Sequence, residues 1–242
     1  MPGSIKTQGV VLRTIRYGEA DRVLHLYTRD RGRVAAMAKG VRRTRTRFGG
    51  RLEPFFRLDM VLYEGRSELL TVTSAETVDA HARLRTDARA LDVAARACDA
   101  VARLFETSEP HPAVYHLLCN ELALLDREPA AHATRANQLA FRLKLLLAAG
   151  LAPQLGACAG CGEREHLTGF SGAAGGVVCA ACEATAFPLG AEAHAFMTEA
   201  LGRPLAEAPV ADERALRQVE RAIAEIAEHH GHTRLRLAFP AS

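Results

Sequence analysis

The sequence lacks any apolar run long enough to cross a membrane, and its first residues contain no stretch of the length that a secretion signal needs. We therefore expect a soluble cytoplasmic protein that does not associate with a membrane. It also lacks a Walker loop, a G-x-S-x-G turn and a recognisable pair of catalytic carboxylates. The absence of a familiar active site counts against an enzyme. Internal repeats and long disordered linkers are missing as well.

Cysteine is scarce, with six residues in 242, yet four of them fall into two C-x-x-C pairs separated by seventeen residues. The pairs are Cys158 with Cys161 and Cys179 with Cys182. Two intervening residues let both sulfurs of a pair reach one ion, so the spacing predicts a tetrahedral four-cysteine zinc site. Four protein ligands leave no position open for substrate. We expect one structural Zn²⁺, held by a loop whose glycines allow tight turns: Gly169, Gly172, Gly175 and Gly176.

Other interpretations of the thiols and histidines are weaker. Two disulfides would need an oxidising compartment, for which the sequence shows no export signal. His166 lies between the pairs and is an alternative ligand. Cys98 and Cys119 lie in helical patterns typical of buried thiols. Three histidines lie near the C-terminus: His229, His230 and His232. They could form a second metal site, but ordinary surface and core positions at a helix end are favoured.

Charge is unevenly distributed. Residues 1–80 hold fifteen Lys and Arg against nine Asp and Glu, whereas the rest hold sixteen against nineteen. Such asymmetry indicates a polyanionic partner. The arginine-rich loop 40–50 and its flanks predict phosphate contacts, with a solvated surface loop as the plainer alternative. The residues expected to make these contacts are Arg31, Arg33, Lys39, Arg42, Arg43, Arg45, Arg47 and Arg51.

Aromatic residues near this basic region are candidates for stacking on bases. Tyr17, Tyr27 and Tyr63 fall on or beside expected strands, where core packing is the commoner role. Phe48 lies inside the basic run, where its neighbours cannot form a core, so we expect it to be the exception.

The first third of the chain reads as strands. Alternation and turn residues predict strands over 5–16, 22–28, 33–39, 55–63 and 69–74, with Gly9 as a bulge and a hairpin turn at 30–32. Five strands in about seventy residues favour a small closed barrel. An OB-type barrel is the natural candidate, and an SH3-like barrel has similar spacing.

After residue 78 the apolar period changes to that of helices. We expect helices over 84–105, 114–126, 137–149, 191–201 and from Pro209 to Gly231, with a short extended tail at 233–238. Leu139, Leu143, Leu146 and Leu147 mark the buried face of the third helix. The fold class is therefore α+β, with a barrel domain at 1–79 and a helical domain at 80–242 that contains the zinc module 155–185.

Four segments resemble the RecO family of bacterial recombination mediators. They are GVVLRTIRYGEADRVLHLYTRDRG (9–32), RFGGRLEPF (47–55), YEGRSELLTVTSAE (63–76) and FRLKLLLAAGLAPQLGACAGCG (141–162). The resemblance covers most of the chain and implies an OB barrel, a helical domain and a place beside the nucleoid. It implies binding of single- and double-stranded DNA, strand annealing, and action with RecR to load RecA onto DNA coated by single-strand-binding protein (SSB), whose C-terminal tail is a partner. Some members lack the cysteines, so zinc rests on this sequence.

Two other function classes stay open on the residues alone. A basic barrel with a four-cysteine site also fits an RNA-binding or transcription-associated zinc protein. A zinc enzyme acting on nucleic acid is the second alternative, and it would need an open ligand position at the metal.

Overall fold

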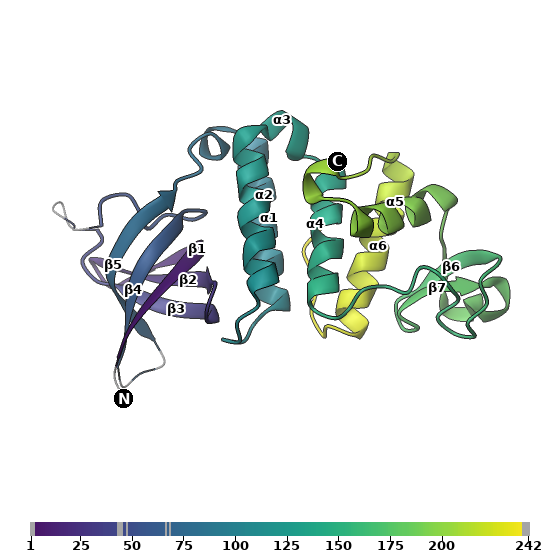
Figure 1. The fold of residues 1–242 in the computed structure, drawn as a ribbon, viewed down its shortest axis with the longest axis horizontal. Helices are drawn as coiled ribbons and strands as arrows, with labels where there is room; N and C mark the ends of the chain where they lie inside the picture. Colours follow the sequence, from purple (N-terminus) through teal and green to yellow (C-terminus); the bar gives the residue numbers. More distant parts are fainter. Residues whose placement is uncertain (1–2, 43–45, 47, 66, 68, 239–242) are drawn as a thin grey trace. The chain divides into compact units, whose positions relative to one another are not determined.

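A computed structural model describes residues 3–42, 46, 48–65, 67 and 69–238. Strands dominate the first third and helices the remainder, which confirms the predicted α+β order (Figure 1). The chain divides into two compact units, Met1–Arg127 and Glu128–Ser242. The first unit therefore keeps two long helices together with the strands, and the division at residue 79 stays a prediction.

Five described strands form a closed barrel in the order β1-β2-β3-β5-β4. Their bounds are β1 Gly3–Tyr17, β2 Asp21–Thr28, β3 Gly32–Ala38, β4 Arg57–Glu64 and β5 Leu70–Asp79. The long first strand pairs antiparallel with β2 along one half and with β4 along the other. The barrel closes through a parallel contact of β3 with β5 that has two residue pairs, Ala36 with Leu70 and Met37 with Thr71.

The alternation of β2 explains the barrel core. Leu24 and Leu26 are fully buried in it, whereas His25 between them points to the outer surface and is half-buried. The predicted bulge at Gly9 is wrong, because the register of β1 against β2 shifts between Val11 and Arg13. Gly9 serves close packing instead: a Cβ there would lie 2.8 Å from Cε of Met60.

Two helices complete the first unit, after a short 3₁₀ turn at Leu84–Thr86. Helix α1 spans Ala88–Leu104 and begins at Asp87, whose side chain accepts a hydrogen bond from the N–H of Ala90. Helix α2 spans Pro112–Arg127, so Pro112 starts a helix at the position where its missing N–H has no cost.

The segment between α1 and α2 packs on the β2–β3 hairpin. The ring of Phe105 lies 6.3 Å from that of Tyr27, edge to face. The N–H of Arg33 donates to the carbonyl of Thr107 at 3.2 Å. Gly32 is required here, because its φ is +52° and a Cβ would lie 2.1 Å from the carbonyl oxygen of Glu109.

The second unit contains the remaining elements. They are α3 Pro129–His132, α4 Arg135–Ala148, β6 Leu167–Ser171, β7 Gly176–Cys179, a 3₁₀ turn at Ala180–Thr185, β8 Phe187–Pro188, α5 Ala191–Gly202, a 3₁₀ turn at Leu205–Glu207 and α6 Glu213–His229. Strands β6 to β8 form a small sheet in the order β7-β6-β8 that sequence reasoning missed. The tail 233–238 contains no strand among its described residues.

The predicted face of α4 is largely right. Leu139, Leu143 and Leu146 are fully buried, whereas Leu147 is 51% exposed, which contradicts its assignment to the buried face. Residues 136–143 are all buried, so the first half of α4 is covered on every side, and Leu147 lies beside the end of the helix at Ala148. Thr134 begins the helix by accepting a hydrogen bond from the N–H of Asn137.

The thiols of Cys98 and Cys119, in the first unit, are buried as expected, and burial raises the pKa of both.

Candidate metal centre and nucleic-acid interface

The four cysteines of the two C-x-x-C pairs come together in the second unit. The sulfurs of Cys158, Cys161, Cys179 and Cys182 all lie within 4.8 Å of one another. The sulfurs of Cys161 and Cys179 are 3.7 Å apart. A tetrahedron with Zn–S bonds of about 2.3 Å has edges of about 3.8 Å, so the cluster fits one ion of that size.

Backbone hydrogen bonds shape the first pair into a tight turn. The N–H of Cys158 donates to the carbonyl of Glu163 at 2.6 Å, and the N–H of Gly162 donates to the carbonyl of Cys158 at 2.8 Å. Gly162 has a φ of +82°, a conformation that favours glycine. A Cβ on Gly160 would lie 3.3 Å from the sulfur of Cys182, so the turn also approaches the second pair closely.

The glycines of the intervening loop have two different roles. Gly175 has a φ of +84° and makes the turn between β6 and β7. Gly172 and Gly176 allow close packing, because a Cβ would lie 2.4 Å from Cβ of Glu225 in one case and 2.2 Å from the carbonyl oxygen of Gln154 in the other. The expectation that all of them serve tight turning is therefore too simple.

The electrostatics of the cluster favour a bound cation. The backbone N–H of Cys179 lowers the pKa of the Cys158 thiol to about 6. Hydrogen bonding with the Cys161 side chain raises the pKa of Cys182 to about 12. Four sulfurs at this spacing cannot all be thiolates unless a positive ion neutralises them, and a cation bound there would remove that conflict.

The weaker alternatives for this region find no support in the geometry. Among the described residues, which include all six cysteines, none forms a disulfide. His166 lies outside the cluster of potential ligands, and so do the three C-terminal histidines. One of these, His230, has its Nε2 2.7 Å from the carbonyl oxygen of Gly172, which is a packing role.

The basic residues named from the sequence occupy opposite ends of β3. Arg31 and Arg33 lie at its start, while Lys39 and Arg42 follow its end and are exposed. The distance along the strand from Arg33 to Lys39 is about 20 Å, at about 3.3 Å per residue. The remaining members of the set are Arg51, which is exposed, and Arg43, Arg45 and Arg47, which lie outside the described residues.

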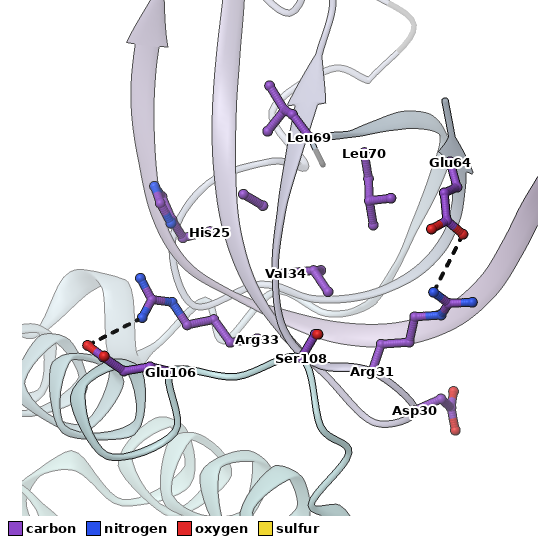
Figure 2. Close-up of a pocket in the computed structure, with 11 residues that line it drawn as sticks. His25, Asp30, Arg31, Arg33, Val34, Glu64, Leu69, Leu70, Glu106 and Ser108 are labelled. Atoms are coloured by element: carbon purple, nitrogen blue, oxygen red, sulfur yellow. Dashed lines mark ion pairs between the residues drawn. The ribbon is translucent and has the colours of Figure 1, made fainter. Parts of the chain in front are cut away.

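The two arginines at the start of β3 line a groove of about 1040 Å³ (Figure 2). Arg31 lies 3.6 Å from the carboxylate of Glu64. Arg33 donates to the carbonyl of Ala102 at 2.9 Å and lies 3.9 Å from Glu106. The pair of Arg31 with Glu64 is exposed, whereas Arg33 is half-buried beside an exposed Glu106. Ion pairs this close to solvent stabilise the fold only weakly.

The aromatic residues divide into buried and exposed members. Phe48 is 1% exposed, and its ring packs in the barrel core. The expectation that it stacks on bases is therefore wrong. Tyr27 is fully buried. Tyr17 and Tyr63 are 59% and 44% exposed.

Sequence reasoning missed two groups beside Arg33. Arg13 of β1 is paired with His25 of β2, which in turn is paired with Ala35 of β3. Burial lowers the pKa of His25, and the charges of Arg13 and Arg33 lower it further. The alternation of β2 could have placed His25 outside the barrel. The register of β1 shifts before Arg13, so simple alternation along this strand does not predict which way the Arg13 side chain points.

The fold and the cysteine cluster define an α+β protein with an N-terminal barrel and a four-cysteine site in its helical part. The family model described as Recombination protein O N terminal matches residues 1–81, and Recombination protein O C terminal matches residues 85–237. The chain belongs to the RecO family.

Similar curated proteins extend over most of the chain. A protein named DNA repair protein RecO from Rubrobacter xylanophilus is 40% identical over 225 residues, 90% of this chain and 89% of its own. Proteins of the same name from Anaeromyxobacter sp. and Bifidobacterium adolescentis are 36% and 45% identical, over 97% and 72% of this chain and 94% and 72% of theirs. Within the part of the chain that the structure describes, no helix has the length and apolar character of a membrane span.

Proposed function

We propose that this chain is a non-enzymatic recombination mediator in DNA repair. Membership of the RecO family carries this proposal, and the names of its relatives support DNA repair as the process. In this role it binds single- and double-stranded DNA, anneals complementary strands and, with RecR, loads RecA onto single strands coated by SSB, whose C-terminal tail it contacts. Its place is beside the nucleoid.

We further propose an OB-type barrel at 1–79 as the DNA-binding domain and a helical domain at 80–242. The closed order β1-β2-β3-β5-β4 and the short parallel contact of β3 with β5 support the OB assignment. The spacing of the four sulfurs supports one structural Zn²⁺ in the module 155–185. The ion would hold the two turns together. With four protein ligands it would have no open position for a substrate, so the site would be structural and not catalytic.

Phosphate contacts come from the basic residues around β3 and the loop that follows it. Lys39 and Arg42 are exposed, as phosphate contacts require. Neutralising phosphates lets two like-charged strands approach, which links binding to annealing. An RNA-binding role is the alternative, and equal single strands of DNA and RNA would separate the two: a clear preference for RNA contradicts the proposal.

The decisive variant changes Arg42, Arg43, Arg45 and Arg47 together to Ala. Each lost phosphate contact should reduce the log-affinity versus log-salt slope on single strands by roughly 0.7, so the slope should flatten by up to about 3. Affinity should fall equally for every sequence, since phosphates carry no base information. Annealing of SSB-coated complementary oligonucleotides should fall with it.

Wild-type affinity, slope and annealing in a normally folded quadruple variant would place the phosphate contacts elsewhere. Arg203→Ala is a suitable control, because this exposed arginine lies in the second unit and pairs with Glu199.

A further inference from the structure

The four cysteines of the candidate metal centre differ in their access to solvent. Cys158 and Cys179 are 3% and 6% exposed, and Cys182 is half-buried. Cys161 is exposed. A small reactive molecule dissolved in water therefore reaches the side chain of Cys161 before those of the other three.

The fold explains why the two pairs differ. Cys179 ends β7, whose residues are all buried. Cys161 instead lies in a turn where residues 160–166 are exposed without a break. A Cβ added to Gly162 would meet nothing within 4 Å among the described residues. The turn therefore leaves room for a small molecule beside Cys161.

A second sulfur lies within reach of Cys161. Its sulfur is 3.7 Å from that of Cys179, and a disulfide bond of about 2.05 Å needs only a modest closure of that distance. The sulfur of Cys158 is engaged differently, because it accepts a hydrogen bond from the N–H of Cys179 at 3.4 Å. A solvent-accessible cysteine beside a second thiol that can resolve it is the arrangement found in redox-responsive sites.

We propose that Cys161 is an oxidation site and that a peroxide joins Cys161 to Cys179 in a disulfide. This bond takes one ligand from each C-x-x-C pair, so the site loses two of its four sulfurs and releases its cation. The inference rests on the structural zinc of the proposed function and adds a chemical control over it.

The reaction balances with one molecule of hydrogen peroxide. The Cys161 thiolate attacks a peroxide oxygen, so an S–O bond forms, the O–O bond breaks, and a sulfenic acid and a hydroxide result. The Cys179 thiolate then attacks the sulfur of Cys161, forms the S–S bond and expels a second hydroxide. Two protons convert the hydroxides to water. Two thiolates have lost two electrons to the peroxide, and a dithiol reductant returns them.

Loss of the cation should open the exposed turn and leave the small sheet in place. The sheet is tied to α6 by groups outside the metal site, because the carboxylate of Glu225 accepts a hydrogen bond from the N–H of Gly172 at 3.1 Å. The turn 160–166 contains Arg164, which is exposed and is a cleavage site for trypsin. Faster cleavage at Arg164 therefore reports on opening of the turn.

The first test treats zinc-loaded wild-type protein with hydrogen peroxide. A chromogenic chelator should detect release of one zinc per chain. The thiol count of the denatured protein should fall from six to four, because the disulfide consumes two of the six cysteines. Peptide mapping should find Cys161 joined to Cys179, with the buried Cys98 and Cys119 still reduced. Cleavage at Arg164 should accelerate, and a dithiol with added zinc should reverse all of these changes.

The second test compares two variants that keep four potential zinc ligands. Cys161→His removes the exposed sulfur, and three cysteines with one histidine form an ordinary zinc site. It should retain its zinc at a peroxide concentration that empties wild type. Cys182→His is the matched control: it keeps Cys161 and Cys179, so it should release zinc as wild type does. Metal analysis and thermal melting before oxidation compare the loading and folding of both variants with those of wild type.

Several outcomes would overturn the inference. One is wild-type protein that keeps its zinc and six thiols under peroxide that fully oxidises cysteine in solution. A disulfide map that does not join Cys161 to Cys179 is another, and so is equal zinc release from wild type and Cys161→His. Untreated protein without zinc would contradict the proposed metal instead, and the thiol count and disulfide map would then decide this inference by themselves. They would also decide it if a histidine variant bound no zinc.

Discussion

At the scale of single residues, the pKa of His25 reflects the burial and the charges around it on the outside of the barrel. Burial and the charges of Arg13 and Arg33 lower its pKa below the ordinary value of 6.5. The folded protein therefore binds this proton less readily than the unfolded chain. By linkage, its favourable contribution to stability is complete above about pH 6.5 and declines as the pH falls from there toward the folded pKa.

We expect the change His25→Gln to remove this pH dependence. The free energy of unfolding of wild type should fall more steeply than that of the variant as the pH drops below about 6.5. Urea titrations at several pH values measure the difference. Arg13→Gln is the matched change: the pKa of His25, followed by NMR, should rise toward 6.5 because one neighbouring cation is gone. Parallel pH profiles of wild type and His25→Gln would contradict this account.

At the scale of elements, helix α4 shows how far burial extends along a helix. Leu143 is fully buried on it, and Leu147, four residues later, is 51% exposed. Residues 136–143 are buried on every side of the helix, whereas Leu147 lies beside the helix end at Ala148, so burial of α4 ends along its length.

Leu143→Ala should therefore destabilise the protein by about 2–5 kcal/mol, the usual cost of truncating a buried leucine. Leu147→Ala should change stability by less than about 0.5 kcal/mol, as expected for a surface position. Chemical denaturation of both variants measures the two values. Equal costs would mean that this face of α4 is assigned incorrectly.

At the scale of the whole molecule, the two compact units place the proposed metal and the proposed DNA contacts in different parts of the chain. The four cysteines lie in the second unit, and the barrel lies in the first. The turns around the cluster are rich in glycine, which loses much conformational entropy on folding, so a bound ion would supply free energy for their folding.

Cys179→Ser should lower the zinc content and expose the module 155–185 to protease, while the barrel stays folded. Metal analysis and limited proteolysis with fragment identification measure these effects. Cys98→Ser, a change at a buried cysteine in α1 outside the cluster, controls for loss of a thiol, and its zinc content should remain that of wild type. A purified protein without stoichiometric zinc that is also fully stable in chelator would refute the structural role.

Local patterns were sufficient for the five barrel strands and the long helices, because alternation with period 2 and with period 3.6 is written in consecutive residues. They did not reveal the short strands β6 to β8, whose few residues show no clear period. The spacing of the two C-x-x-C pairs was also sufficient to predict that the four cysteines lie together, and they do. The family resemblance rested on short segments of the same kind.

Only the tertiary structure decided which outward side chains are covered. Phe48 lies in a basic run yet is buried in the barrel, whereas Ile15 and Tyr17 lie in an ordinary strand pattern yet remain exposed. Burial depends on residues far away in the chain, such as Phe105 against Tyr27. The bulge before Arg13 reversed which residues of β1 face outward, and a shift of one residue in a strand moves every later side chain to the opposite face.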